Sequence, residues 1–143
     1  MKKITDHLSV LLADTYALYL KTQNYHWHVH GPYFKTLHEL FEEQYNELAL
    51  AVDALAERIR TLDAKAPATF SEFIKLTTIK EGNSSLKSEQ MIKELMEDHE
   101  LLIKKLKQSY EIAEKALDHA TSDLINSRID HHEKTHWMLA SSL

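Results

Sequence analysis

The sequence predicts an all-α protein, a four-helix bundle with a short extra helix in the long connection between helices two and three. Gly and Pro number only 2 each among 143 residues, too few for the turns of an all-β fold. Apolar residues make up 43% of the chain and recur at steps of three and four, the spacing of amphipathic helices. The length is that of one domain, which we take as residues 1–143.

The first two long helices are separated by a tight turn. The first is expected from Ile4 to about His30, and Gly31-Pro32 ends it, because a residue before proline disfavours helical angles. The second is expected from near Tyr33 to about Leu62. One apolar stripe runs along this second helix, formed by Phe34, Leu37, Phe41, Leu48, Val52, Leu55 and Ile59.

A long connection follows the second helix. The segment 63–67 breaks the helical pattern without a glycine to end the helix. Thr69 or Ser71 can cap a short helix from Ser71 to Leu76, since a side-chain oxygen there accepts a bond from a free backbone N–H. Together with the loop 82–85, the connection is long enough to span the bundle, which allows one crossover.

The last two long helices complete the bundle. The third is expected from about Leu86 to Leu117. The fourth is expected from Asp123 to about Leu139, with Thr121 or Ser122 as its cap. Four long helices with these connections form an antiparallel bundle.

Composition excludes several classes of protein. Without cysteine there is no disulfide framework, no thiolate zinc site and no cysteine nucleophile. The net charge of −5 disfavours a general nucleic-acid binder, because such binding depends on neutralising phosphates. The longest apolar runs, 8–13 and 48–52, fall far short of the roughly 20 residues of a membrane span, and Asp6 and Asp14 interrupt any signal-peptide core. We therefore expect a cytoplasmic protein without a membrane partner, and leave association with the nucleoid open.

The second helix carries two pairs of candidate metal ligands. His38 and Glu42 form one pair and Asp53 and Glu57 the other, each spaced i, i+4 so that its side chains share a face. The simpler interpretation is a charged helix face that is exposed to solvent and binds no metal. Against it, Ala49 and other small residues in the same sector permit close approach of another helix.

The two pairs lie about 15 residues apart, roughly 22 Å along a helix, so they cannot form one site within a monomer. A two-fold axis near Glu47 or Leu48 would bring the first pair of one subunit against the second pair of its partner. Each of the two resulting sites would hold one imidazole and three carboxylates, which suit iron, manganese or zinc.

The end of the first helix supplies further imidazoles. His26, His28 and His30 alternate, and alternate positions on a helix cannot all face one point. At most one or two of them can therefore serve the site near His38.

Three segments resemble the Dps family, the ferritin-like mini-ferritins of starved or oxidatively stressed bacteria. They are Tyr25-His-Trp-His-Val-His-Gly-Pro, Leu37-His-Glu-Leu-Phe-Glu-Glu and Val52-Asp-Ala-Leu-Ala-Glu-Arg-Ile-Arg, and the C-terminal His132-Glu-Lys-Thr-His-Trp-Met-Leu is similar to the family's last helix. The resemblance covers nearly the whole chain. It implies a ferritin-like fold and a hollow shell of twelve subunits that stores ferric iron and protects the cell and its DNA.

The resemblance also implies a ferroxidase, an enzyme that oxidises Fe(II) to Fe(III), with hydrogen peroxide as the favoured oxidant. Its centres would lie between subunits and could take two ions each. The implied catalytic and metal-binding residues are His26, His38 and Glu42 of one subunit with Asp53 and Glu57 of its partner. The family commonly has Asp at the position of Glu42 and Asn at the position of His28.

Three further residues receive expected roles from the resemblance. Trp27 would lie near the metal and take up oxidising equivalents. Asp118 and Asp123 match acids that line pores at the three-fold axes of the shell. The alternative for both acids is a helix N-terminus, where the helix dipole favours negative charge.

Other hypotheses compete with this one. Glu133 and His136 have the Glu-x-x-His spacing of di-iron sites within one subunit, but the first helix has no Glu to complete such a site. Direct coating of DNA is the second alternative. The short basic start Met1-Lys2-Lys3 and a charge of about −60 over twelve copies predict weak or no DNA binding. A bundle without metal would leave the ligand pairs unexplained.

Overall fold

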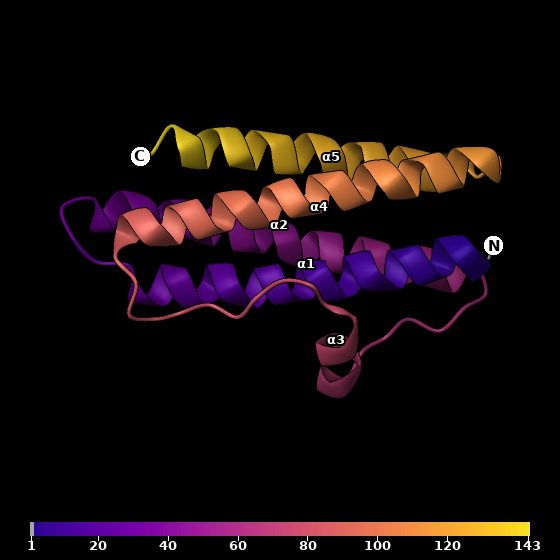
Figure 1. Ribbon diagram of the computed structural model, residues 1–143, viewed down its shortest axis with the longest axis horizontal. Coiled ribbons are helices and arrows are strands. Elements are labelled where there is room, and N and C mark those ends of the chain that lie inside the picture. Colours follow the sequence, from indigo (N-terminus) through magenta and orange to yellow (C-terminus); the bar gives the residue numbers. More distant parts are fainter. Residues whose placement is uncertain (1) are drawn as a thin grey trace.

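The computed structural model describes residues 2–143, with side chains from residue 3 onward, so that Met1 of the short basic start lies outside the described residues. Its helices are α1 (Lys2–His28), α2 (Phe34–Thr61), α3 (Phe70–Leu76), α4 (Ser88–Lys115) and α5 (His119–Ala140). In Figure 1 the four long helices run side by side along the long axis, and the short α3 lies outside them next to α1. The four-helix bundle with a short extra helix in the long connection is confirmed.

The core lies between the four long helices, because each one buries an apolar stripe. On α2 the stripe includes Phe41 and Ile59, both without exposed surface, and Leu55, which is almost fully buried. Burying such a side chain contributes roughly 1.5–3 kcal/mol. Phe34, expected in this stripe, is 44% exposed and is the first residue of α2.

Two helices end at residues in the left-handed region of backbone space. Asp63 follows α2 with a φ of 62°, and Leu117 follows α4 with a φ of 56°. Aspartate tolerates this conformation, so Asp63 takes the place of the glycine that usually ends a helix. Leu117 was expected inside the third long helix. Its positive φ instead ends α4 at Lys115.

The start of α5 corrects the sequence prediction. The helix begins at His119 rather than Asp123, and its cap is Asp118 rather than Thr121 or Ser122. The Asp118 carboxylate accepts bonds from the backbone N–H of Thr121 at 3.2 Å and from its hydroxyl at 2.5 Å. For α3, Thr69 is the cap, accepting from the Glu72 N–H at 3.2 Å.

The connection between α2 and α4 is fixed to the bundle by a fully buried carboxylate of α1, Asp14. Its oxygens accept bonds from the Thr77 hydroxyl at 2.8 Å and the Thr78 N–H at 2.6 Å, and the Lys105 ammonium of α4 lies 2.7 Å away. These bonds neutralise the charge that burial would otherwise make costly. The part of the connection that follows α3 is therefore attached to α1 at Asp14.

Among the helices of residues 2–143, none combines the length and the apolar character needed to cross a lipid bilayer.

Candidate metal centre

Two histidines from neighbouring helices meet where α1 ends and α2 begins. Nδ1 of His26 lies 2.6 Å from the backbone oxygen of His38, and Nδ1 of His38 lies 2.7 Å from the backbone oxygen of His26. The two rings stack with centroids 3.8 Å apart and planes at 14°. The pair is thus held by reciprocal hydrogen bonds across the helix junction.

These bonds determine which nitrogen of each ring carries the proton. A carbonyl oxygen only accepts, so Nδ1 of both His26 and His38 must donate an N–H. In the neutral imidazole, Nε2 then keeps its lone pair and can bind a metal ion. Each neutral ring therefore has an Nε2 lone pair that is available to a metal ion.

Glu42 completes a group of three. Its side chain lies one turn after His38, and its Oε1 is 3.7 Å from Nε2 of His26. One ligand atom from each of His26, His38 and Glu42 lies within 4.8 Å of the others. His26 is buried, His38 half-buried and Glu42 exposed, so the group opens outward on one side. Imidazole with carboxylate suits iron, zinc or manganese.

Aromatic rings pack around the two imidazoles. Phe34 stacks on His38 at 4.9 Å, and Tyr45 meets His26 edge-on at 5.2 Å and 70°. Sequence reasoning did not single out Tyr45. Its position seven residues after His38, on the same helix face, was the available signal.

The local chain conformation explains why these histidines meet. Gly31 has a φ of 118°, a region that side chains rarely adopt, so this residue allows the tight reversal between the helices. On the other side, the buried Tyr25 donates its hydroxyl to Glu94 of α4 at 2.6 Å and accepts from the Asn83 N–H at 3.2 Å. The end of α1 is thereby fixed to both α4 and the crossover.

Asp53 and Glu57 do not join this group in the single chain. Both are exposed on α2, three to four turns beyond Glu42. Within residues 3–143 of one chain, neither forms an ion pair. Leu50, on the same face of α2, is 74% exposed. That face therefore combines unpaired carboxylates with an uncovered leucine, and the partner contribution stays a prediction.

The other residues near the end of α1 lie outside the group. Trp27 directly follows His26 and is 58% exposed. His28 is exposed, and its Nδ1 lies 2.9 Å from the backbone oxygen of Asn24. His30 is exposed beyond the end of α1.

The two acids expected at a pore differ in their surroundings. Asp118 is only 8% exposed and pairs with the Arg58 guanidinium at 2.8 Å, besides capping α5. Its bonds to Thr121 and the Arg58 charge hold the pKa of this carboxyl below its ordinary value, against the effect of burial. Asp123 is exposed. The charge of Asp118 is thus balanced by Arg58 of the same chain, whereas the carboxylate of Asp123 is exposed to solvent.

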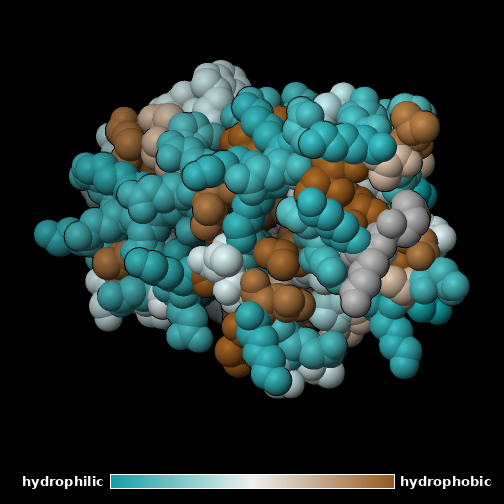
Figure 2. Space-filling model, turned by 45° about the vertical axis from the view of Figure 1, so that its right-hand side comes forward, coloured by the Kyte–Doolittle hydropathy of each residue, from teal (hydrophilic) through white to brown (hydrophobic). Residues whose placement is uncertain are grey.

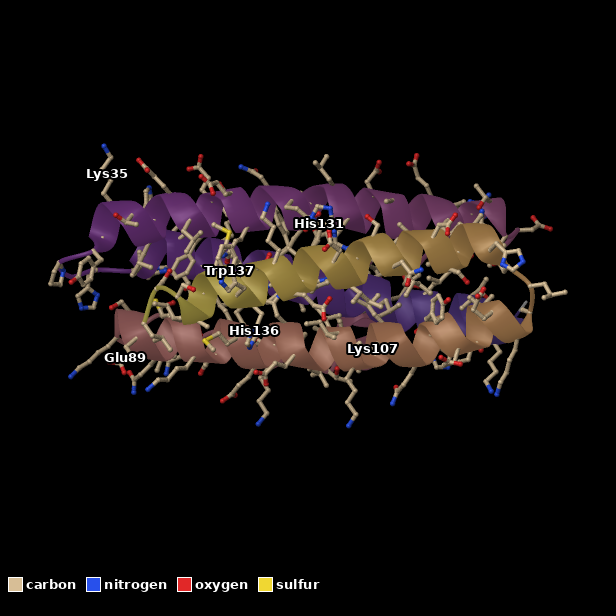
Figure 3. All side chains as sticks on the ribbon, turned by 90° about the horizontal axis from the view of Figure 1, so that it is seen from above. Lys35, Glu89, Lys107, His131, His136 and Trp137 are labelled. Carbon is tan, nitrogen blue, oxygen red and sulfur yellow. The ribbon has the colours of Figure 1, made fainter. Side chains whose placement is uncertain are left out.

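The alternative site on α5 does not gather a group of three metal-binding side chains within the described residues. Nε2 of His136 lies 2.8 Å from Glu100 of α4, and Glu133 is exposed. Figure 3 shows His136 on the side of α5 toward α4, and His131 on the side toward α2. In the part of the chain that the structure describes, His26, His38 and Glu42 are the only group with metal-ligand spacing.

A second histidine pair, not singled out from the sequence, is buried between α4 and α5. Nδ1 of His99 lies 2.8 Å from Nδ1 of His132, and Nε2 of His132 lies 3.2 Å from Arg128. Burial lowers the pKa of His99 to about 3 and that of His132 well below its ordinary value, and the Arg128 charge acts in the same direction. Both rings are therefore neutral near pH 7 and belong to the core.

Comparisons with known proteins give a uniform result. A family model described as "Ferritin-like domain" matches residues 5–143. The "DNA protection during starvation protein 2" of Bacillus anthracis is 39% identical over 142 residues, which are 99% of this chain and 97% of that protein.

Two solved structures agree. Dps from Thermosynechococcus elongatus superposes with a TM-score of 0.95 at 36% identity, over 98% of this chain and 89% of that one. The Dps protein of Vibrio cholerae O1, described as "a member of a broad superfamily of ferritin-like diiron-carboxylate proteins", gives a TM-score of 0.94 at 36% identity. That match covers 98% of this chain and 88% of the other.

Proposed function

Because the chain belongs to the ferritin-like family, and within it to the Dps proteins, we propose that it oxidises Fe(II) to Fe(III) with hydrogen peroxide and stores the ferric product. The observation that carries the proposal is the reciprocal bonding of His26 and His38, which leaves both Nε2 lone pairs beside Glu42. The Vibrio cholerae structure's description as a diiron-carboxylate protein supports iron as the substrate.

The proposed site is shared between two subunits. His26, His38 and Glu42 of one subunit bind Fe(II), and Asp53 and Glu57 come from the partner across a two-fold axis. The uncovered Leu50 between the two ligand pairs supports this arrangement, since large exposed apolar side chains on one face mark interaction surfaces.

Further exposed apolar side chains lie on α1 and α3. Leu20 of α1 and Phe70 and Ile74 of α3 are 52%, 78% and 73% exposed and line one cleft. Figure 2 shows hydrophobic patches among hydrophilic residues on the face that it displays. We propose that subunits assemble through such surfaces into a hollow shell of twelve.

The chemistry follows from the ligand types. Two ferrous ions each give up one electron, and one peroxide takes both electrons and two protons to become two water molecules. The carboxylates favour the product, because the higher charge of Fe(III) gains more from anionic ligands than that of Fe(II). His26 and His38 hold the ions in place without needing to move, since their ring orientations are fixed by the carbonyl bonds.

The first experiment loads the protein anaerobically with Fe(II), adds peroxide and follows the ferric absorbance. His38→Ala should slow oxidation by more than about tenfold, because even indirect ligand contacts are worth about tenfold or more in metal affinity. Glu133→Ala and His30→Ala are the matched controls and should leave the rate unchanged. If His38→Ala oxidises Fe(II) as fast as wild type, the proposed site is wrong.

The second experiment tests the sharing of the site between subunits. In a mixed pair of His38→Ala and Asp53→Ala subunits, one of the two sites keeps all its ligands and the other loses both. Random mixing should therefore restore about a quarter of the wild-type rate, although each variant alone is slowed by more than about tenfold. No recovery would mean that the ligands come from one subunit.

The alternative is a DNA-coating protein with little ferroxidase activity. The net charge of −5 per chain opposes it, because repeated copies create a field that repels phosphates. We expect no gel shift of duplex DNA at roughly 0.15 M salt. Tight binding at that salt, together with wild-type-like iron chemistry in His38→Ala, would favour the alternative.

A further inference from the structure

A chain of aromatic rings starts at the metal centre and runs along α1. The Tyr45 ring meets His26 edge-on at 5.2 Å, and the Tyr19 ring meets Tyr45 edge-on at 5.8 Å. The Tyr16 ring follows at 5.8 Å from Tyr19, and it stacks on Phe73 of α3 at 4.8 Å. Each step lies within the 4.5–7 Å range of direct ring contact. Three phenols are thus connected to a candidate iron ligand without a gap.

Helical spacing explains the continuity. Tyr16, Tyr19 and His26 lie at i, i+3 and i+10 on α1, on one stripe of the helix. Tyr45 comes from α2, seven residues after His38, and bridges from the imidazole pair to that stripe. From His26 to Tyr16 the chain extends ten residues, or about 15 Å along the helix.

The far end lies beside a cavity. Tyr16 and Phe73 line a space of about 300 Å³ between α1 and α3. The space opens to solvent in the single chain, and Lys21, Lys80 and Glu81 line part of it, so water can reach this end of the chain of rings. The three tyrosines are themselves half-buried. Tyr19 accepts a long hydrogen bond from Gln23 at 3.4 Å, which leaves its own O–H available to donate.

We propose that Tyr45, Tyr19 and Tyr16 form a redox chain that carries a stray oxidising equivalent away from the iron site. The proposal rests on the proposed ferroxidase function. It concerns turnovers in which a centre holds a single Fe(II), because peroxide then receives one electron instead of two. Fe(II) becomes Fe(III), and peroxide splits into hydroxide and a hydroxyl radical.

The following steps balance atoms and electrons. The hydroxyl radical takes the phenolic hydrogen atom of Tyr45 and becomes water, leaving a tyrosyl radical. Tyr19 then gives one electron to Tyr45, which regains a proton from water, while Tyr19 loses its phenolic proton to water. The same exchange moves the radical to Tyr16. Phe73 has no phenol and is much harder to oxidise, so the radical stops at Tyr16.

Tyrosine-to-phenylalanine variants separate this role from packing, because they keep the ring and remove the O–H. The protein is loaded anaerobically with less than one Fe(II) per centre, mixed with peroxide and frozen for electron paramagnetic resonance. Ring-deuterated tyrosine identifies a tyrosyl signal by its narrowing. We expect this signal in wild type and the loss of most of it in Tyr45→Phe. The matched control is Tyr33→Phe, at a 72% exposed tyrosine outside the chain, which should keep it.

Two further readouts belong to the same experiment. Tyr19→Phe should form as much ferric product as wild type and keep a radical at Tyr45 only. A spin trap in solution should capture more hydroxyl radical from Tyr45→Phe than from wild type. Unchanged melting temperatures show that the variants fold.

The outcomes distinguish the two proposals. If wild type forms no ferric product with peroxide, the ferroxidase proposal fails, and the redox chain fails with it. Ferric product without a tyrosyl signal, or with a signal that Tyr45→Phe leaves intact, overturns the redox chain alone. A tryptophan radical in its place would assign the trapping to Trp27 or Trp137 and would also overturn it.

Discussion

The buried pair His99 and His132 should make the bundle sensitive to acid. Arg128 can only donate, so Nε2 of His132 accepts from it, and the proton of His132 lies on Nδ1. His132 therefore donates to Nδ1 of His99, and the proton of His99 lies on Nε2, a buried atom without a hydrogen-bond partner in the described chain. A further proton on either ring would face an N–H group, so both rings resist protonation.

The expected magnitude follows from linkage. Above pH 6.5 both histidines are neutral in the folded and the unfolded chain, so folding stability does not depend on them. Below that pH the two imidazoles bind protons in the unfolded chain but stay neutral in the folded chain. The reason is that burial lowers the pKa of His99 to about 3 and also lowers that of His132. For His99 this costs about 1.4 kcal/mol per pH unit, or about 2 kcal/mol at pH 5, and the lowered pKa of His132 adds a loss in the same direction.

The assay is the free energy of unfolding in denaturant from about pH 7 to about pH 5, at one protein concentration, so that the proposed assembly contributes equally to every sample. His99→Gln keeps an acceptor for His132 and removes one titrating group. It should reduce the loss on acidification by about 2 kcal/mol. The exposed His30→Gln is the control and should lose as much as wild type. If His99→Gln also loses as much, His99 is not held neutral and the reasoning fails.

Three further predictions concern assembly, capping and the core. Leu50→Asp places a charge on the proposed two-fold face and should give a smaller particle by light scattering; an unchanged particle size would place the interface elsewhere. Asp118→Ala should lower the free energy of unfolding by about 1–2 kcal/mol, since it removes the cap of α5 and the Arg58 ion pair, whereas exposed Asp123→Ala should lower it by less than about 0.5 kcal/mol. Equal effects of these two variants in denaturant titrations would refute the capping role. Phe41→Ala should cost about 3–5 kcal/mol in the same titrations, because Phe41 has no exposed surface, and a cost below 1 kcal/mol would contradict its place in the core.

The helices and their exposed ligand pairs were predictable because both depend on local spacing. His38 and Glu42 lie one turn apart on any helix, so their common face did not depend on the fold. The breaks near Gly31 and Asp63 also came from local chemistry. The start of α5 was missed because Asp118, Thr121 and Ser122 are all residue types that cap helices. Only the structure shows that Asp118 is the one whose side chain accepts from a free backbone N–H.

The contact between His26 and His38 was decided by tertiary structure. Helical spacing left His26, His28 and His30 as candidates, since alternation only limits how many can converge, and the resemblance to the Dps family singled out His26. The packing of α1 on α2 brings His26 against His38 and sets both tautomers through backbone carbonyls. The buried His99 also had a local signal, because it interrupts the apolar stripe of α4, but its partner His132 is 33 residues away.

The sequence by itself determined long amphipathic helices, the absence of cysteine thiolates as metal ligands, and the face of α2 that carries Asp53 and Glu57. The tertiary structure decided which imidazoles meet and that three tyrosines, from α1 and α2, touch in series. The physical reason is the sequence separation of the residues that interact. Side-chain spacing within a helix is fixed by its 3.6-residue period, whereas contacts between helices depend on how whole faces pack.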